Sequence, residues 1–216
     1  MTLKNFIVFE GIDGAGTTTQ IRLLREKVQN LNLKKNFFFT QEPSSSPTGI
    51  FLRSMLKGDV KCTNETAAYL FAADRNEHVK GSLKTEENNL VSGIQKACEN
   101  GNIVISDRYF FSSLAYQSTD CPPEVPRLLN SLFPLPELLF YFEITPETAL
   151  KRVDGRGERE IYEKQDFLTK TVEHYHQVLD EYSCKKAEGM KIVKLDATES
   201  KEKIAVKIWH EIEELL

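Results

Sequence analysis

The sequence lacks any apolar run long enough to span a membrane, because none approaches the ~18 residues that a spanning helix needs. It also contains no internal repeat and no low-complexity tract. Its first residues, Met1–Asn5, lead directly into an apolar segment, so we expect no signal peptide. These absences predict a cytoplasmic protein that does not associate with membranes.

Cysteine is scarce, and its spacing excludes the usual cysteine-based sites. The four cysteines are scattered along the chain and form no C-x-x-C pair or metal-ligand pattern; they are Cys62, Cys98, Cys121 and Cys184. We therefore expect reduced thiols without a catalytic or metal-binding role, as in cytosolic proteins.

Neither sign of charge dominates the sequence. The 216 residues include 28 Lys and Arg against 32 Asp and Glu, which gives a formal net charge of −4. This balance argues against a protein that coats nucleic acid or a membrane surface, so any anion site must be built locally. No Pro- or Gly-rich linker interrupts the chain, and we expect one domain over residues 1–216.

The most informative feature that is present is a glycine-rich loop at residues 11–18. It follows an apolar run, Phe6–Phe9, and precedes apolar residues at helical spacing. Gly11 and Gly16 match the spacing of G-x-x-x-x-G-K-[ST], in which backbone N–H groups hold phosphate oxygens. A tight turn without a ligand is the alternative. The candidate ATP-binding residues are Gly11, Ile12, Asp13, Gly14, Ala15, Gly16, Thr17, Thr18 and Thr19.

This loop lacks the lysine of the pattern, since Thr17 occupies that position. A P-loop lysine acts as a point charge on the β- and γ-phosphates, and losing such a contact costs roughly 3–4 kcal/mol of transition-state stabilisation. We expect either a replacement cation, such as a lid arginine, or a slow or inactive nucleotide-binding protein. Thr18 retains the hydroxyl that binds magnesium in the pattern.

Apolar runs and helical patterns alternate along the chain. The predicted strands are residues 6–9, 36–40, 103–106, 138–142 and 191–195, and the predicted helices are 21–31, 64–79, 84–99, 145–152, 167–182 and 201–216. Two loops are also predicted, a proline-rich one at 119–126 and a charged lid at about 153–165. The alternation predicts an α/β fold with a five-stranded parallel sheet, helices on both faces, and ligands at the carboxyl ends of the strands.

One further cluster lies on the predicted helix 64–79. Phe71 and Arg75 are four residues apart and project from one face, where they can stack a base and grip a phosphate. An amphipathic helix with a surface arginine is the alternative, and we expect His78 to be a surface residue at the helix end.

Two more clusters follow strands or lie in the lid. Asp107 ends a predicted strand, where it can hold magnesium, and Arg108 beside it suits an anionic substrate; a strand-end ion pair is the alternative. Arginines from Arg152 to Arg159 can close over phosphates, although charged loops are usually only solvated.

Five segments occur in an order that points to one family. Residues 9–20 read F-E-G-I-D-G-A-G-T-T-T-Q, 40–43 T-Q-E-P, 70–78 L-F-A-A-D-R-N-E-H and 107–117 D-R-Y-F-F-S-S-L-A-Y-Q, and 145–158 run from T-P-E to R-G-E. In these segments, which cover nearly the whole chain, the sequence resembles the thymidylate kinases, a family of P-loop nucleoside monophosphate kinases. The resemblance implies a three-layer P-loop kinase fold with a short lid. It also implies a homodimer that phosphorylates dTMP to dTDP with ATP and Mg²⁺ in dTTP biosynthesis.

The resemblance also implies roles for particular residues. Asp13 would meet the thymidine 3′-hydroxyl, Phe71 would stack on thymine, and Arg75 and Arg108 would hold the acceptor phosphate or base. The implied catalytic residues are Asp13, Arg108, Arg156 and Arg159, of which the last two are lid arginines near the ATP phosphates. Ser113, Tyr116 and Gln117 would line the base and sugar pocket, and Thr18 and Asp107 would hold the metal ion.

The chain also departs from the family pattern. Thr17 replaces the P-loop lysine, Gln41 stands where the family has arginine in T-R-E-P, and Ser44 and Ser45 replace two glycines. Gly14 fits the subgroup that takes its catalytic arginine from the lid. The departures leave two alternatives open, a catalytically weak or inactive nucleotide-binding protein and a kinase for another nucleoside monophosphate.

Overall fold

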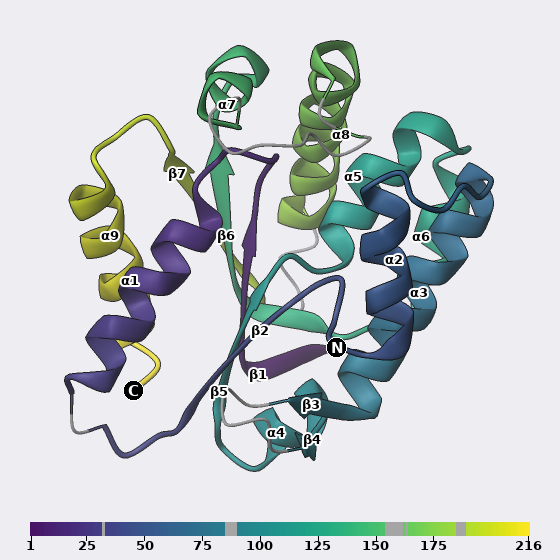
Figure 1. Cartoon of the computed structure of the whole chain (residues 1–216). Helices are drawn as coiled ribbons and strands as arrows, with labels where there is room; N and C mark the ends of the chain where they lie inside the picture. Colours follow the sequence, from purple (N-terminus) through teal and green to yellow (C-terminus); the bar gives the residue numbers. More distant parts are fainter. Residues whose placement is uncertain (32, 85–89, 154–161, 163, 185–188) are drawn as a thin grey trace.

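A five-stranded parallel sheet forms the centre of the computed structural model, which describes residues 1–31, 33–84, 90–153, 162, 164–184 and 189–216 (Figure 1). The strands lie in the order β2-β5-β1-β6-β7. Their bounds are β1 Thr2–Glu10, β2 Phe37–Gln41, β5 Ile103–Asp107, β6 Leu135–Glu143 and β7 Lys191–Asp196. Every neighbouring pair is parallel, so the carboxyl ends of all five strands share one edge.

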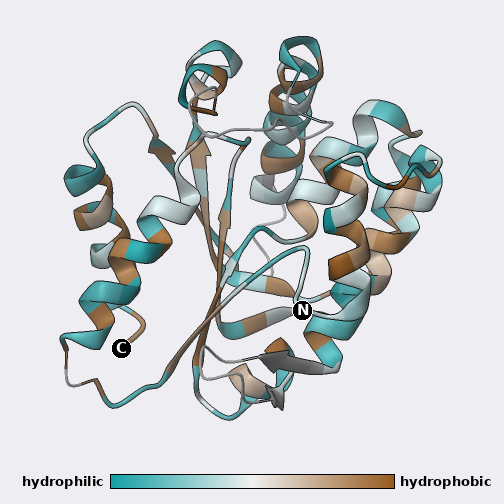
Figure 2. Ribbon diagram, in the orientation of Figure 1, coloured by the Kyte–Doolittle hydropathy of each residue, from teal (hydrophilic) through white to brown (hydrophobic). Residues whose placement is uncertain are grey.

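The strands are apolar on both faces because both faces are covered. Phe6–Phe9 of β1 and Ile103–Ile105 of β5 have no exposed surface. Strands buried on both sides are continuous hydrophobic runs rather than alternating patterns, which is why these segments were predictable. Figure 2 shows the hydrophobic colour concentrated along the central strands, with hydrophilic residues on the outer surfaces of the helices.

Helices cover the sheet on both faces, as the sequence predicts. On one side α1 (Thr17–Gln29) packs against α9 (Lys201–Glu213), and on the other α5 (Phe110–Asp120) packs against α3 (Asn64–Lys80) and α8 (Gln165–Cys184) (Figure 1). The remaining helices are α2 Pro47–Leu56, α4 Ile94–Glu99, α6 Glu124–Asn130 and α7 Pro146–Val153. Within the described residues, no helix is long and apolar enough to cross a membrane.

The predicted helix over residues 84–99 is wrong in its first part. Two antiparallel strands, β3 (Ser82–Lys84) and β4 (Leu90–Ser92), occupy that stretch, and α4 begins only at Ile94. Gly93 lies between β4 and α4, and a Cβ at this position would lie 2.6 Å from the carbonyl oxygen of Val79. The chain therefore approaches the end of α3 closely, which the helical spacing of apolar residues does not reveal.

Two other segments are more helical than the sequence analysis expected. The loop predicted over residues 119–126 is shorter, because α5 continues to Asp120 and α6 begins at Glu124. Helix α2 was not predicted, although its start carries a recognisable signal. Ser46 caps it by accepting a hydrogen bond from the Gly49 backbone N–H, and Pro47 is its first residue.

Candidate active site

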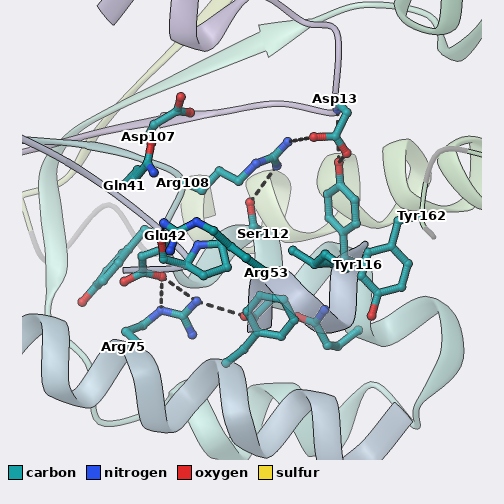
Figure 3. Close-up of a pocket in the computed structure, with 16 residues that line it drawn as sticks. Asp13, Gln41, Glu42, Arg53, Arg75, Asp107, Arg108, Ser112, Tyr116 and Tyr162 are labelled. Atoms are coloured by element: carbon teal, nitrogen blue, oxygen red, sulfur yellow. Dashed lines mark hydrogen bonds and ion pairs between the residues drawn. The ribbon is translucent and has the colours of Figure 1, made fainter. Parts of the chain in front are cut away.

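A pocket lies at the carboxyl ends of β1, β2 and β5 (Figure 3). Sequence-predicted site residues from three separate segments meet there; they are Asp13, Phe71, Arg75, Asp107, Arg108, Ser113, Tyr116 and Gln117. They come from the loop after β1, from α3, and from the end of β5 with the following α5. The parallel topology brings these segments to one edge of the sheet, which is where such folds bind ligands.

The glycine loop between β1 and α1 is shaped by its backbone. Gly14 and Gly16 have φ angles of 87° and 99°, in the left-handed region that favours glycine. A Cβ on Gly14 would also lie only 2.4 Å from the Ala149 carbonyl oxygen. Gly16 is the N-cap of α1 and, within the described residues, no side chain caps this helix, so its first N–H groups are open to an anion.

Thr18 and Asp107 join the glycine loop to the pocket. The Thr18 hydroxyl donates to Asp107 Oδ2 at 2.9 Å, across 89 residues of sequence. The other carboxylate oxygen, Oδ1, is buried and has no hydrogen-bond partner within the described residues. Mg²⁺ takes hydroxyl and carboxylate oxygens together with waters and substrate phosphates, so this pair fits the predicted magnesium site.

Arg108 lies in the pocket with its guanidinium already oriented. It donates to Asp13 Oδ1 at 2.6 Å, to the Gly11 carbonyl at 2.8 Å and to the Ser112 hydroxyl at 3.1 Å. Tyr116 donates its hydroxyl to Asp13 Oδ2 at 3.0 Å, and Figure 3 shows Asp13 between the two side chains. The φ of Arg108 is 72°, which aims the side chain back toward the glycine loop.

A second pocket borders the same loop on the side of α7 and α9. Its walls include Gly14, Gly16 and Thr19 from the loop and α1, and Arg152, Glu199 and Lys201 from the other side. Arg152 Nη2 donates to the Ala197 carbonyl at 2.9 Å, and Nη1 donates to the Gly14 carbonyl at 3.4 Å. Arg152 therefore ties the glycine loop to the segment after β7.

Comparison with known proteins gives the family. The thymidylate kinase family model matches residues 9–208. A "Putative thymidylate kinase" of Treponema pallidum is 37% identical over 214 residues, which are 98% of this chain and 96% of the relative. A "Thymidylate kinase" of Leptospira interrogans is 35% identical over 178 residues, 81% of each chain. The chain belongs to the thymidylate kinase family. It is accordingly a nucleoside monophosphate kinase.

Arg75 is buried in this thymidylate kinase homologue, so the alternative of a surface arginine is wrong. Its side chain is 1% exposed and lines the pocket. Nε donates to Glu42 Oε2 at 2.8 Å and Nη2 to Ser113 Oγ at 3.0 Å, and Nη1 bonds Asn130. Figure 3 shows Arg75 facing Glu42. A buried charge needs such partners, because burial without them costs several kcal/mol.

His78 is also buried, which corrects the expectation of a surface residue at the end of α3. It is 2% exposed, and its Nδ1 lies 3.1 Å from Glu42 Oε1. Its Nε2 lies 2.6 Å from the Thr40 hydroxyl oxygen. His78 and Arg75 thus hold the Glu42 carboxylate from both sides, at the carboxyl end of β2.

Several residues that line the thymidylate kinase pocket were not predicted from the sequence, among them Glu42, Arg53 and Tyr162. Glu42 belongs to the T-Q-E-P segment, directly after Gln41. Arg53 lies on the unpredicted helix α2 and donates to the Ser44 carbonyl at 2.6 Å. Tyr162 lies in the predicted lid and stacks on Phe167 with ring centroids 4.8 Å apart. The lid arginines Arg156 and Arg159 lie outside the described residues.

Glu10, the last residue of β1, is a buried carboxyl behind the glycine loop. It accepts hydrogen bonds from the Tyr109 N–H at 2.8 Å, the Ser112 hydroxyl at 2.6 Å and the Tyr175 hydroxyl at 2.9 Å. Burial raises the pKa of Glu10 from 4.5 to about 7, although the charge of Arg108 and these hydrogen bonds oppose the shift. Glu10 therefore titrates near neutral pH in the folded protein.

This shift predicts a pH dependence of stability. Folded Glu10 keeps its proton up to about pH 7, whereas the unfolded chain releases it near 4.5, so the free energy of unfolding falls as pH rises between these values. The loss amounts to at most about 3 kcal/mol. Urea denaturation at pH 5 and pH 8 should show this loss in the wild type and not in Glu10→Gln. Glu124→Gln, at the exposed start of α6, is the control; parallel pH profiles for wild type and Glu10→Gln would contradict the assignment.

Proposed function

We propose that this chain transfers the terminal phosphoryl group of ATP to dTMP, giving ADP and dTDP on the route to dTTP, as one domain over residues 1–216. The observation that carries the proposal is the hydrogen bond between Thr18 and Asp107. It joins a phosphate-binding loop to a pocket that holds an arginine and base-binding side chains. Two nucleotides bound on either side of this contact would have their phosphates facing each other, as in-line transfer requires.

The base end of the pocket suits a pyrimidine with an N3–H donor and an O4 acceptor. Phe71 is half-buried on α3 and offers a ring face for stacking. Gln117 is buried, and its Oε1 has no hydrogen-bond partner among the described residues, so it can accept from N3–H. Arg75 can only donate, which favours a carbonyl oxygen at position 4. Thymine fits this set and cytosine does not, because cytosine has an acceptor at N3 and an amine at position 4.

The other end of the acceptor pocket suits a phosphate. Arg108 and Arg53 both line it, and each is oriented by hydrogen bonds to backbone carbonyl oxygens. Arg108 and Tyr116 hold the Asp13 carboxylate in place, and its oxygens could still accept a hydrogen bond from a sugar hydroxyl. The acceptor phosphate would therefore lie beside Arg108, and the sugar between Asp13 and the base pocket.

The donor nucleotide would bind along the glycine loop and into the second pocket. Backbone N–H groups of residues 11–19 would hold its phosphates, and Thr18 and Asp107 would hold Mg²⁺. A bound Mg²⁺ would supply positive charge that offsets the charge developing on the phosphate oxygens during transfer. The chain itself orients the two nucleotides and excludes water. The lid arginines Arg156 and Arg159 are proposed to neutralise the transferred phosphoryl group.

The proposal is tested by coupled ADP release with purified protein, ATP, Mg²⁺ and one acceptor at a time. Turnover is expected with dTMP, and little with dCMP, whose base reverses the donors and acceptors that Gln117 and Arg75 would meet. Turnover with another monophosphate and none with dTMP would refute the substrate. Nucleotide binding without turnover would instead support a catalytically weak or inactive binder, the alternative that Thr17 favours.

We also propose that the chain forms a homodimer. Large apolar side chains are exposed on the neighbouring helices α2, α3 and α6 and just after them; they are Ile50, Phe51, Tyr69, Leu128 and Leu132. A second copy of the chain would remove this apolar surface from water. Light scattering of the purified protein should give the mass of a dimer.

A further inference from the structure

The segment between β2 and the first turn of α2, residues 43–48, is held by one buried carboxylate. Asp74 of α3 is 1% exposed. Its Oδ2 accepts a hydrogen bond from the Ser44 backbone N–H at 2.6 Å. Its Oδ1 accepts from the hydroxyls of Ser44 at 2.7 Å, Ser46 at 2.6 Å and Thr48 at 2.9 Å. All of these donors come from one short stretch of chain, so Asp74 fixes the position and the shape of that stretch.

Asp74 carries a negative charge at this buried position. Burial would raise the pKa of Asp74, but the hydrogen bonds from Ser46, Ser44 and Thr48 together outweigh it and hold the pKa below the ordinary value of 3.8. Hydrogen bonds to an ionised acceptor are short and roughly twice as strong as those between neutral groups. The segment is therefore anchored firmly to α3 through Ser44.

The anchored segment in turn orients Arg53, which lines the acceptor pocket (Figure 3). Arg53 Nη1 donates to the Ser44 carbonyl at 2.6 Å, and Nη2 donates to the Pro43 carbonyl. Gly49 lets α2 pack closely on this segment, since a Cβ there would lie 2.0 Å from the Ser44 carbonyl oxygen. A guanidinium has further N–H groups on these nitrogens and on Nε, so Arg53 can still donate to a ligand.

The link between α3 and Arg53 includes a hydroxyl that is a departure of this chain. Ser44 occupies a position where the family pattern has glycine. A glycine would keep the backbone N–H and the carbonyl, but not the hydroxyl that donates to Asp74 and accepts from the Ser46 N–H at 3.0 Å. The departure at Ser44 therefore strengthens the attachment of the pocket segment to α3.

We propose that Asp74 is a positioning residue for the acceptor phosphate, because through Ser44 it holds Arg53 where the guanidinium meets the phosphate of dTMP. The inference rests on the proposed function and deepens it. Recognition of a phosphate by arginine depends on the direction of its N–H groups, so a shift of the Ser44 carbonyl would weaken the contact. Arg108, which also lines the pocket, is oriented by Asp13 and the Gly11 carbonyl and should not depend on Asp74.

Two variants test the inference by calorimetry and in the coupled assay. Asp74→Asn turns an amide N–H₂ toward either the Ser44 N–H or the hydroxyls, so Kd and KM for dTMP should rise about 10-fold. Ser44→Ala keeps the carboxylate and removes one hydroxyl, and should raise both by about 3-fold. Neither variant should change kcat or KM for ATP. Ser45→Ala, at the exposed neighbouring serine, is the matched control and should leave all of these constants unchanged.

Thymidine, which has the base and sugar of dTMP but no phosphate, separates positioning of Arg53 from general damage to the pocket. Asp74→Asn should weaken the binding of dTMP and leave the binding of thymidine unchanged. In an Arg53→Met background, Asp74→Asn should add little to the loss, because the arginine that it positions is gone. Equal losses for dTMP and thymidine, or losses that add fully in the double variant, would overturn the inference.

Thermal melting shows whether Asp74→Asn keeps its fold. If it does not, Ser44→Ala decides the question with the carboxylate in place, and wild-type affinity for dTMP in that variant would overturn the inference. Binding of dTMP that follows the expected pattern without turnover would support Asp74 and refute only the proposed phosphoryl transfer. A wild-type protein that does not bind dTMP would overturn both.

Discussion

Replacing Asp107 with asparagine is expected to lower kcat for dTMP phosphorylation by about 10²–10³-fold. Asparagine retains an oxygen that can accept the Thr18 hydroxyl, so the contact between the glycine loop and β5 should survive. It removes the negative charge that would hold Mg²⁺, and it places an amide where a buried oxygen now lacks a partner. The Mg²⁺ concentration for half-maximal rate should therefore rise, which a titration of the coupled assay would measure.

The matched control is Asp120→Asn at the exposed end of α5, which should change neither kcat nor the Mg²⁺ dependence. Thermal melting of both variants separates a lost metal contact from lost folding. If Asp107→Asn melts like the wild type and keeps its kcat and its Mg²⁺ requirement, Asp107 is not a metal-binding residue. The carboxylate would then serve only to hold Thr18.

Strand positions were predictable because buried parallel strands have a strong local signal. The run Ile103–Ser106 is apolar with no alternation, and the observed strand differs from it by one residue, Asp107. The position of the site at the carboxyl ends follows from the topology alone. The helix signals were weaker. Leu90, Ile94 and Ala97 fit a helical period, yet Leu90 lies in strand β4. Pairing of β4 with β3 overrides the local spacing there.

The surroundings of Arg75 could not be predicted from the local sequence pattern. Spacing from Phe71 places Arg75 on the pocket face of α3, but its partners Glu42 and Asn130 are 33 and 55 residues away. Nothing in the four-residue spacing distinguishes a solvated arginine from one enclosed by a carboxylate and an amide. The same holds for His78, whose place near a helix end suggested exposure. The environment of both residues is set by contacts with residues that are distant in sequence.

Glu42→Gln is expected to destabilise the fold by about 3–5 kcal/mol, the cost of leaving a buried charge without its partner. Glu42 and Arg75 have side chains that are 4% and 1% exposed, with Oε2 and Nη2 2.7 Å apart. Glutamine removes the charge that balances the guanidinium and also alters the contact with His78. Urea denaturation should give the free energy directly, and the melting temperature should fall by roughly 10 °C for a chain of this size.

A matched control for this buried pair is the exposed pair between Arg22 and Glu26, whose side chains are 58% and 53% exposed. Glu26→Gln should cost less than about 0.5 kcal/mol, because solvent screens the charges. Combining Glu42→Gln with Arg75→Met should cost clearly less than the sum of the single changes, since the double variant leaves no unpaired charge. Equal losses for Glu42→Gln and Glu26→Gln would mean that water reaches Arg75, and the acceptor pocket would then be far more hydrated than its contacts indicate.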